Sequence, residues 1–151
     1  MIDNDGTIVQ LVDPNNIAWH AKGANNHSIG VDISNAYYTK YMSSYTKKGL
    51  GVRPVCTNSV VHGKRLQNHL GFYPAQIQAY SALIRFLCKT YDIPYDYPKD
   101  ENGFLCTTVY QPAVKNKFKG VVNHYNLTRN KIDTAGLKLD EIIDNIKEME
   151  A

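Results

Sequence analysis

The chain has 151 residues and a mass of 17.0 kDa, the size of one domain. Its composition, 43% hydrophobic and 21% charged, is that of a globular protein and excludes wholesale disorder, a collagen-like repeat and a coiled coil. The net charge of +3 is too small to indicate a nucleic-acid partner by itself. No apolar run approaches the roughly 18 residues of a membrane span, and the N-terminus lacks the basic and apolar segments of a signal peptide.

Two short strands are predicted near the N-terminus. Asp5-Gly6 is a tight-turn dipeptide, and the alternating β-branched run at 8–12 predicts the second strand of a hairpin. Residues 28–33 alternate in the same way and predict another strand, with the acidic Asp32 inside it. An acid at such a place most often faces water, but the exposed face of a strand can also form the floor of a cleft.

A long irregular region separates these strands from the first predicted helix. Residues 36–72 are rich in Tyr, Gly, Lys and Ser without a sustained period, which predicts an excursion or insertion rather than core elements. Apolar residues then recur at helical spacing from Pro74, which suits a first helical turn, and Ile93-Pro94 marks the exit. This pattern predicts a long helix.

The C-terminal part predicts short strands followed by a second helix. One strand is expected at 105–109, and another at 120–123 places His124 at its end. An apolar stripe over 139–146, with acidic residues in its first turn, predicts an amphipathic helix packed on a sheet. The order of elements predicts an α/β (α+β) fold, a mixed central β-sheet flanked by helices, in a single domain over 1–151.

Two segments carry most of the residues suited to chemistry. They are AWHAKGANNHSIGVD at 18–32 and VNHYNLTRNKIDTAG at 122–136, and a long helix lies between them. In residues and order they resemble the two signature blocks of the zinc-dependent N-acetylmuramoyl-L-alanine amidases, a family that includes phage amidase-type lysozymes and peptidoglycan recognition proteins. The resemblance runs from about Gly6 to Gly136, and 36–72 resembles an insertion of some phage-type members.

The resemblance implies a zinc site and a catalytic role for four residues. His124 and Asp133 match two of the three protein ligands of Zn²⁺, and three such ligands leave a fourth position for water. Asp32 stands where bacterial members often carry a glutamate as general base, and it is one methylene shorter. Lys131 matches a lysine that supports the developing oxyanion in some members.

The resemblance also implies a cleft and a further ligand. His20 matches a histidine that lines the cleft, and Asn25 and Asn26 match the loop that shapes it. In the family the remaining ligand is a histidine on a strand upstream of the Asp-Gly turn, which this sequence does not contain. Three interpretations stay open. A missing N-terminal segment or a partner chain completes the site, another histidine substitutes for the ligand, or the fold is kept without catalysis; the candidate substitutes are His27, His62 and His69.

The first interpretation is favoured, because the missing hairpin strand and the missing ligand would lie in one segment. The implied activity is zinc-activated hydrolysis of the amide between N-acetylmuramic acid and L-alanine in peptidoglycan. As an endolysin of a bacteriophage, such a protein would act from the host cytoplasm after the onset of lysis, or from the virion. A non-catalytic peptidoglycan-binding or phage structural module is the alternative. A nucleic-acid-binding domain is a weaker one, and it rests on Lys115, Lys117, Lys119, Arg129 and Lys131.

Overall fold

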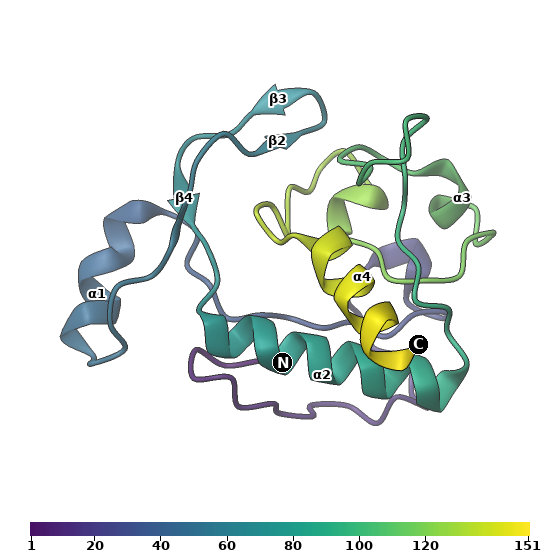
Figure 1. Cartoon of the computed structure of the whole chain (residues 1–151), viewed down its shortest axis with the longest axis horizontal. Helices are drawn as coiled ribbons and strands as arrows, with labels where there is room; N and C mark the ends of the chain where they lie inside the picture. Colours follow the sequence, from purple (N-terminus) through teal and green to yellow (C-terminus); the bar gives the residue numbers. More distant parts are fainter.

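The computed structural model describes residues 1–151, and two helices form its centre. Helix α2 (Pro74–Tyr91) runs along one side of the molecule, and helix α4 (Leu139–Glu150) packs across it (Figure 1). Both predicted helices are confirmed. Helix α2 begins with a proline in its first turn and is capped after Tyr91 by Asp92, which adopts a left-handed conformation with φ +52°.

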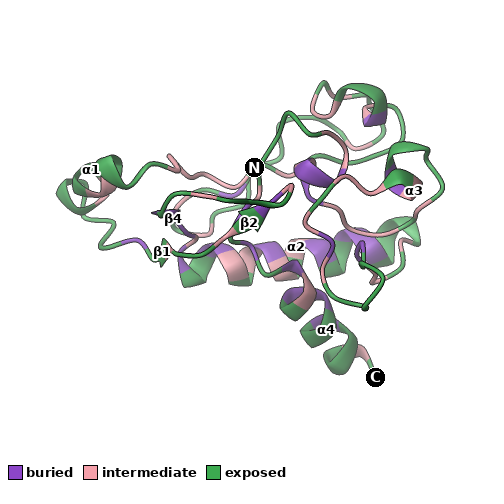
Figure 2. Ribbon diagram, turned by 90° about the horizontal axis from the view of Figure 1, so that it is seen from above, coloured by how far each residue is buried: buried purple, intermediate pink, exposed green.

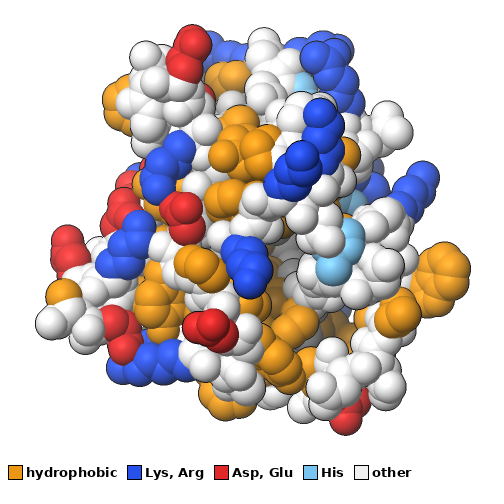
Figure 3. Space-filling view, turned by 90° about the vertical axis from the view of Figure 1, so that its right-hand side faces the viewer, with side chains coloured by type: hydrophobic (Ala, Val, Ile, Leu, Met, Phe, Trp, Pro, Cys, Tyr) orange, Lys and Arg blue, Asp and Glu red, His pale blue; other side chains and the backbone are white.

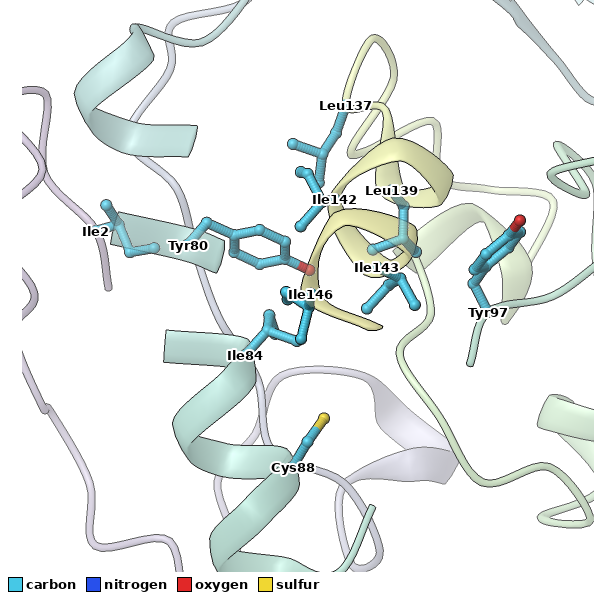
Figure 4. Close-up of a cluster of buried hydrophobic side chains, with 10 residues drawn as sticks. All are labelled: Ile2, Tyr80, Ile84, Cys88, Tyr97, Leu137, Leu139, Ile142, Ile143 and Ile146. Atoms are coloured by element: carbon cyan, nitrogen blue, oxygen red, sulfur yellow. The ribbon is translucent and has the colours of Figure 1, made fainter. Parts of the chain in front are cut away.

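The main hydrophobic core lies between these helices. Helix α2 buries one stripe of residues at intervals of four, and α4 buries its apolar stripe against that surface (Figure 4). The burial colours of Figure 2 follow the same stripe along α2. The ten buried members are Ile2, Tyr80, Ile84, Cys88, Tyr97, Leu137, Leu139, Ile142, Ile143 and Ile146.

The α+β class is confirmed, with a β component made of short pieces. Strand β1 (Val55–Cys56) pairs antiparallel with β4 (His69–Leu70), and β2 (Val60–Val61) pairs antiparallel with β3 (Lys64–Arg65). None of the helices combines the length and apolar character required to cross a membrane.

The strands predicted at 8–12 and 28–33 are reduced to single bridges at Ile2. Ile2 bridges Ile8 in the antiparallel sense and Ile33 in the parallel sense. The pattern of each segment suits a sheet, but a ladder also needs successive partners on a neighbouring strand. Ile2 is the one residue that bridges these two segments, so these isolated bridges stand where the central sheet was expected.

The two later strand predictions were wrong. Residues 105–109 contribute a single bridge, between Leu105 and Lys99. Residues 120–123 are extended but lie outside any strand, and they lead into the 3₁₀ turn η3 (His124–Asn126). A short helix, α3 (Gln111–Val114), and the turn η1 (Lys22–Ala24) complete this side of the molecule.

Residues 36–72 form a projection from the helical body, which we call the basic lobe (Figure 1). It contains the turn η2 (Thr39–Tyr41), helix α1 (Met42–Lys47) and the four strands. Strands β2 and β3 are joined by His62-Gly63, both with positive φ, as a two-residue hairpin turn requires. The region predicted to be irregular therefore holds two small antiparallel pairs and a helix.

Arg53 joins the basic lobe to the body. Its guanidinium is buried and donates to Asn4 Oδ1 at 2.7 Å, Gln76 Oε1 at 2.5 Å and the carbonyls of Ser34 and Gly71 at 2.8 and 2.9 Å. Burial lowers the pKa of this guanidinium, and two tyrosine rings oppose that effect. Those rings lie 4.5 and 4.7 Å from its central carbon. The charge is therefore held by acceptors and rings rather than by a carboxylate.

Candidate active site

A cavity of about 490 Å³ lies beside the C-terminal half of α2. Its walls come from the segments 20–33, 116–124 and 133–137, which are far apart in the sequence. The space-filling view of this side shows a hollow with hydrophobic side chains on its floor and a histidine near its rim (Figure 3). The segments that resemble the two signature blocks therefore face one another across one cavity.

His124 and Asp133 form a pair on the wall of this cavity. His124 Nδ1 lies 2.9 Å from Asp133 Oδ2, and both residues line the hollow. The imidazole is 25% exposed and the carboxylate side chain 56% exposed, so both can be reached from solvent. The pair is a hydrogen bond between neutral His124 and the carboxylate, and an ion pair when the ring is protonated.

The position of His124 is fixed by the turn that it begins. Asn126 is fully buried, and its side-chain Nδ2 donates to the carbonyls of Cys106 and Thr108 at 2.8 and 2.9 Å. Its Oδ1 accepts from the backbone N–H of Asn123 at 3.0 Å. Asn126 therefore uses its whole amide to anchor the turn.

Two further contacts hold the segment of Asp133 against this turn. The backbone N–H of Tyr125 donates to the carbonyl of Asp133 at 3.0 Å, and the Thr134 hydroxyl donates to Asn123 Oδ1. Asn123 Nδ2 in turn donates to the Tyr125 hydroxyl at 2.8 Å. Burial raises the pKa of that hydroxyl, so it stays protonated at neutral pH. His124 and Asp133 are nine positions apart in the sequence, and these hydrogen bonds of the backbone and of buried side chains hold them next to each other.

The basic lobe supports the same segment from the other side. His62 Nε2 donates to the carbonyl of Lys131 at 2.9 Å, which fixes the hydrogen on that nitrogen because a carbonyl only accepts. Gly136, with φ +82°, lies so close to the lobe that a Cβ would be 2.6 Å from Cys56 Sγ and 2.9 Å from the His69 ring. Glycine is required there both by conformation and by space.

His20 organises the first wall of the cavity. Its Nδ1 donates to the Ala18 carbonyl at 2.8 Å, and its Nε2 lies 2.8 Å from Ser28 Oγ. The ring rests on Gly30, where a Cβ would come within 2.7 Å of it. Asn25 Oδ1 accepts from the backbone N–H groups of His20 and Ala21 at 3.0 and 2.6 Å. The ring nitrogens of His20 are thus occupied within its own loop.

The predicted site residues divide into two groups. Four of them line the cavity: His20, Asp32, His124 and Asp133. The other three, which are Asn25, Asn26 and Lys131, do not line it. Asp32 is exposed, and its backbone carbonyl accepts from the N–H of Ile2 at 2.8 Å, which fixes the extended segment that carries the carboxylate.

The candidate substitutes for a third ligand lie in different places. His27 lines the cavity, and its Nδ1 lies 2.8 Å from Asn26 Oδ1. His62 and His69 belong to the basic lobe and do not line the cavity; His69 is buried, stacks on Tyr37 at 4.9 Å and bonds Ser59 Oγ at 2.9 Å. The structure brings no three His, Cys, Asp or Glu side chains into an arrangement that could hold a metal ion.

Sequence reasoning missed the residues that position the loop of Asp133. His62 and Asn126 contact segments distant in the chain; His62 was considered only as a substitute metal ligand, and Asn126 was assigned no role. One local pattern could have located His62: the dipeptide His62-Gly63 follows two valines, as a hairpin turn does.

Comparison with known proteins gives the class and then the family. The chain matches the family model of N-acetylmuramoyl-L-alanine amidase over residues 1–136, which includes both signature blocks and every residue of the cavity wall except Leu137. The match puts the chain among hydrolases of peptidoglycan amide bonds. The chain belongs to the N-acetylmuramoyl-L-alanine amidase family. No curated protein and no solved structure gave a match.

Proposed function

We propose that this protein hydrolyses the amide between the lactyl group of N-acetylmuramic acid and L-alanine of the stem peptide. The observation that carries the proposal is the His124–Asp133 pair at 2.9 Å on the wall of a cavity that Asp32 also lines. The family match supports the reaction class. Resemblance of the basic lobe to a phage-type insertion supports a place in cell-wall lysis by a bacteriophage.

We also propose that the pair holds Zn²⁺, and the donor set fits two of the protein positions that such an ion takes. An imidazole nitrogen and a carboxylate oxygen are usual zinc ligands. His124 Nδ1 and Asp133 Oδ2 face each other at 2.9 Å, so these two side chains would hold the ion together. A third protein ligand, from His27, a further segment or a partner chain, completes the proposed set.

When bound, such an ion polarises the scissile carbonyl and lowers the pKa of water. The chain's own residues then have distinct tasks. Asp32 accepts the proton of the attacking water on a carboxylate oxygen and delivers it to the leaving amine. Lys131, two residues before Asp133, brings its ammonium group from the rim to the oxyanion of the tetrahedral intermediate. The loops of His20 and Asn25 keep the cleft open to a peptide.

The decisive experiment measures new amino termini released from purified peptidoglycan in the presence of zinc. His124→Ala and Asp133→Ala should each abolish release and weaken zinc binding to the purified protein. Asp144→Ala, a carboxylate on the outer face of α4, is the matched control and should leave both unchanged.

Two results would contradict the proposal. Release at the wild-type rate by both variants, with their folds intact by circular dichroism, would reject the assigned pair. Binding of muropeptides by the wild type without hydrolysis, at saturating zinc, would instead favour the non-catalytic module.

A further inference from the structure

The charges of this protein are segregated between its two parts. The basic lobe contains six of the seventeen basic residues and none of the fourteen acidic residues. Its net charge is therefore +6, and the rest of the chain carries −3, although the whole chain has only +3. A segment of 37 residues without one carboxylate is unusual in a chain with this content of acids.

Most of the lobe's charges face solvent, and none of them is paired with a carboxylate. Five of its basic residues are exposed: Lys40, Lys47, Lys48, Lys64 and Arg65. None of them lies within 4.0 Å of a carboxylate, whereas Arg85 and Lys89 on α2 both bond Glu150. Unpaired cations on one projection produce a positive potential that attracts anions at the range of the Debye length, about 10 Å at 0.1 M salt.

The lobe is also continuous with the candidate active site. A second hollow, of about 130 Å³, lies between the lobe and the loop of Asp133, and Tyr37, Leu70 and Phe72 line it from the lobe's side. The two hollows share Ile33, Asp133 and Thr134. A polymer that extends from the cavity past Asp133 and Thr134 therefore reaches the base of the lobe.

We propose that the basic lobe is a docking surface for peptidoglycan itself, and that it binds the free carboxylates of stem peptides next to the one being cut. This inference rests on the proposed function, because it takes the substrate polymer as its partner. The continuity of the lobe with the cavity favours peptidoglycan over a nucleic acid as the partner, since the substrate polymer can contact both surfaces at once. The lobe would speed the first contact with peptidoglycan and slow its dissociation, and the residues of the cavity would catalyse the hydrolysis.

The test is sedimentation with purified sacculi stripped of attached polymers, at several NaCl concentrations. A lobe variant, K40Q/K47Q/K48Q/K64Q, should bind sacculi about tenfold more weakly than the wild type at low salt. A body variant with the same change in net charge, K99Q/K115Q/K138Q/K147Q, is the matched control and should bind within about twofold of the wild type. A charge-conserving variant, K40R/K47R/K48R/K64R, should restore binding.

Several results would overturn the docking proposal. Equal losses in the lobe and body variants would mean that only net charge matters, and no loss in either would mean that the lobe is not used. Tighter wild-type binding to duplex DNA or to phosphatidylglycerol vesicles, lost only in the lobe variant, would assign the surface to another partner.

Hydrolysis of a soluble muropeptide, which is too short to reach the lobe, separates this inference from the proposed function. The lobe variant should cleave it at the wild-type rate while losing activity on sacculi. Absence of cleavage by the wild type would reject the proposed function, and the sedimentation result would still decide the docking surface.

Discussion

The helical body and the basic lobe are held together by different forces. The body encloses ten buried apolar residues between α2 and α4. The lobe contributes Phe72 to the edge of that core and Val61 to a smaller cluster with Tyr125 and Ala135, and it is also held by hydrogen bonds from Arg53 and His62. Apolar burial stabilises roughly in proportion to area, whereas hydrogen bonds contribute about 1 kcal/mol each.

This difference indicates that most of the stability comes from the body and that the lobe is attached to it by fewer apolar contacts. It also explains where the loop of Asp133 lies, since that loop is clamped between the two. Substitutions that remove the interactions of one part test this difference, because their effects on the stability of the body and of the lobe can be measured separately.

The largest effect is expected from Ile143→Ala in the body. Ile143 is fully buried on α4, and the variant leaves a cavity among residues from both helices. We expect a loss of about 3–4 kcal/mol in the free energy of unfolding, measured by urea denaturation. The control is Met149→Ala on the same helix, where the side chain is 66% exposed, with a loss below about 0.5 kcal/mol. Equal effects of the two substitutions would refute the assignment of the core.

Arg53→Met should come next, with a loss of about 2–3 kcal/mol. The substitution keeps the bulk of the side chain but leaves the buried oxygen of Gln76 and the Ser34 carbonyl without this donor. We expect the lobe to loosen while the body stays folded, so limited proteolysis should cleave within 36–72 first. Arg65→Met, also in the lobe but exposed, should change neither stability nor cleavage. Cleavage in the body at the same rate as in the lobe would contradict the picture of two parts.

The sequence predicted the body far better than the lobe. Helices α2 and α4 can be predicted from the spacing of apolar residues within one segment, such as Ile142 and Ile146 in α4. The segment at 8–12 has a strand pattern, but its ladder depends on a partner that local pattern does not reveal. His62 contacts Lys131, which is 69 positions away in the sequence, so no local periodicity predicts this contact. His124 and Asp133 were found through resemblance, and their 2.9 Å contact depends on the folded turn.

His62→Phe should produce a smaller effect, confined to the loop of Asp133. The phenyl ring fills the same space but cannot donate to the Lys131 carbonyl. We expect a local loss of about 1 kcal/mol, seen as about fivefold faster hydrogen exchange at the Ala135 amide, which bonds the Ile132 carbonyl at 2.8 Å. His62→Gln retains a donor and should restore most of the protection. Unchanged exchange in the phenylalanine variant would show that the lobe does not support this loop.

The smallest effect is expected from Glu150→Gln, at the contact of α4 with α2. Hydrogen bonds from Lys89 and Arg85 lower the pKa of Glu150, so the folded state favours the ionised carboxylate. The resulting stability is present above the glutamate pKa of the unfolded chain, about 4.3, and is lost as the pH falls through the lower folded value. Thermal melts should therefore show a slightly lower Tm for the variant at pH 7 and none of this difference at about pH 2. Glu148→Gln, on the same last turn but outside any ion pair, carries the same change in helix-dipole energy, so a pH-dependent difference of equal size there would assign the effect to the dipole instead.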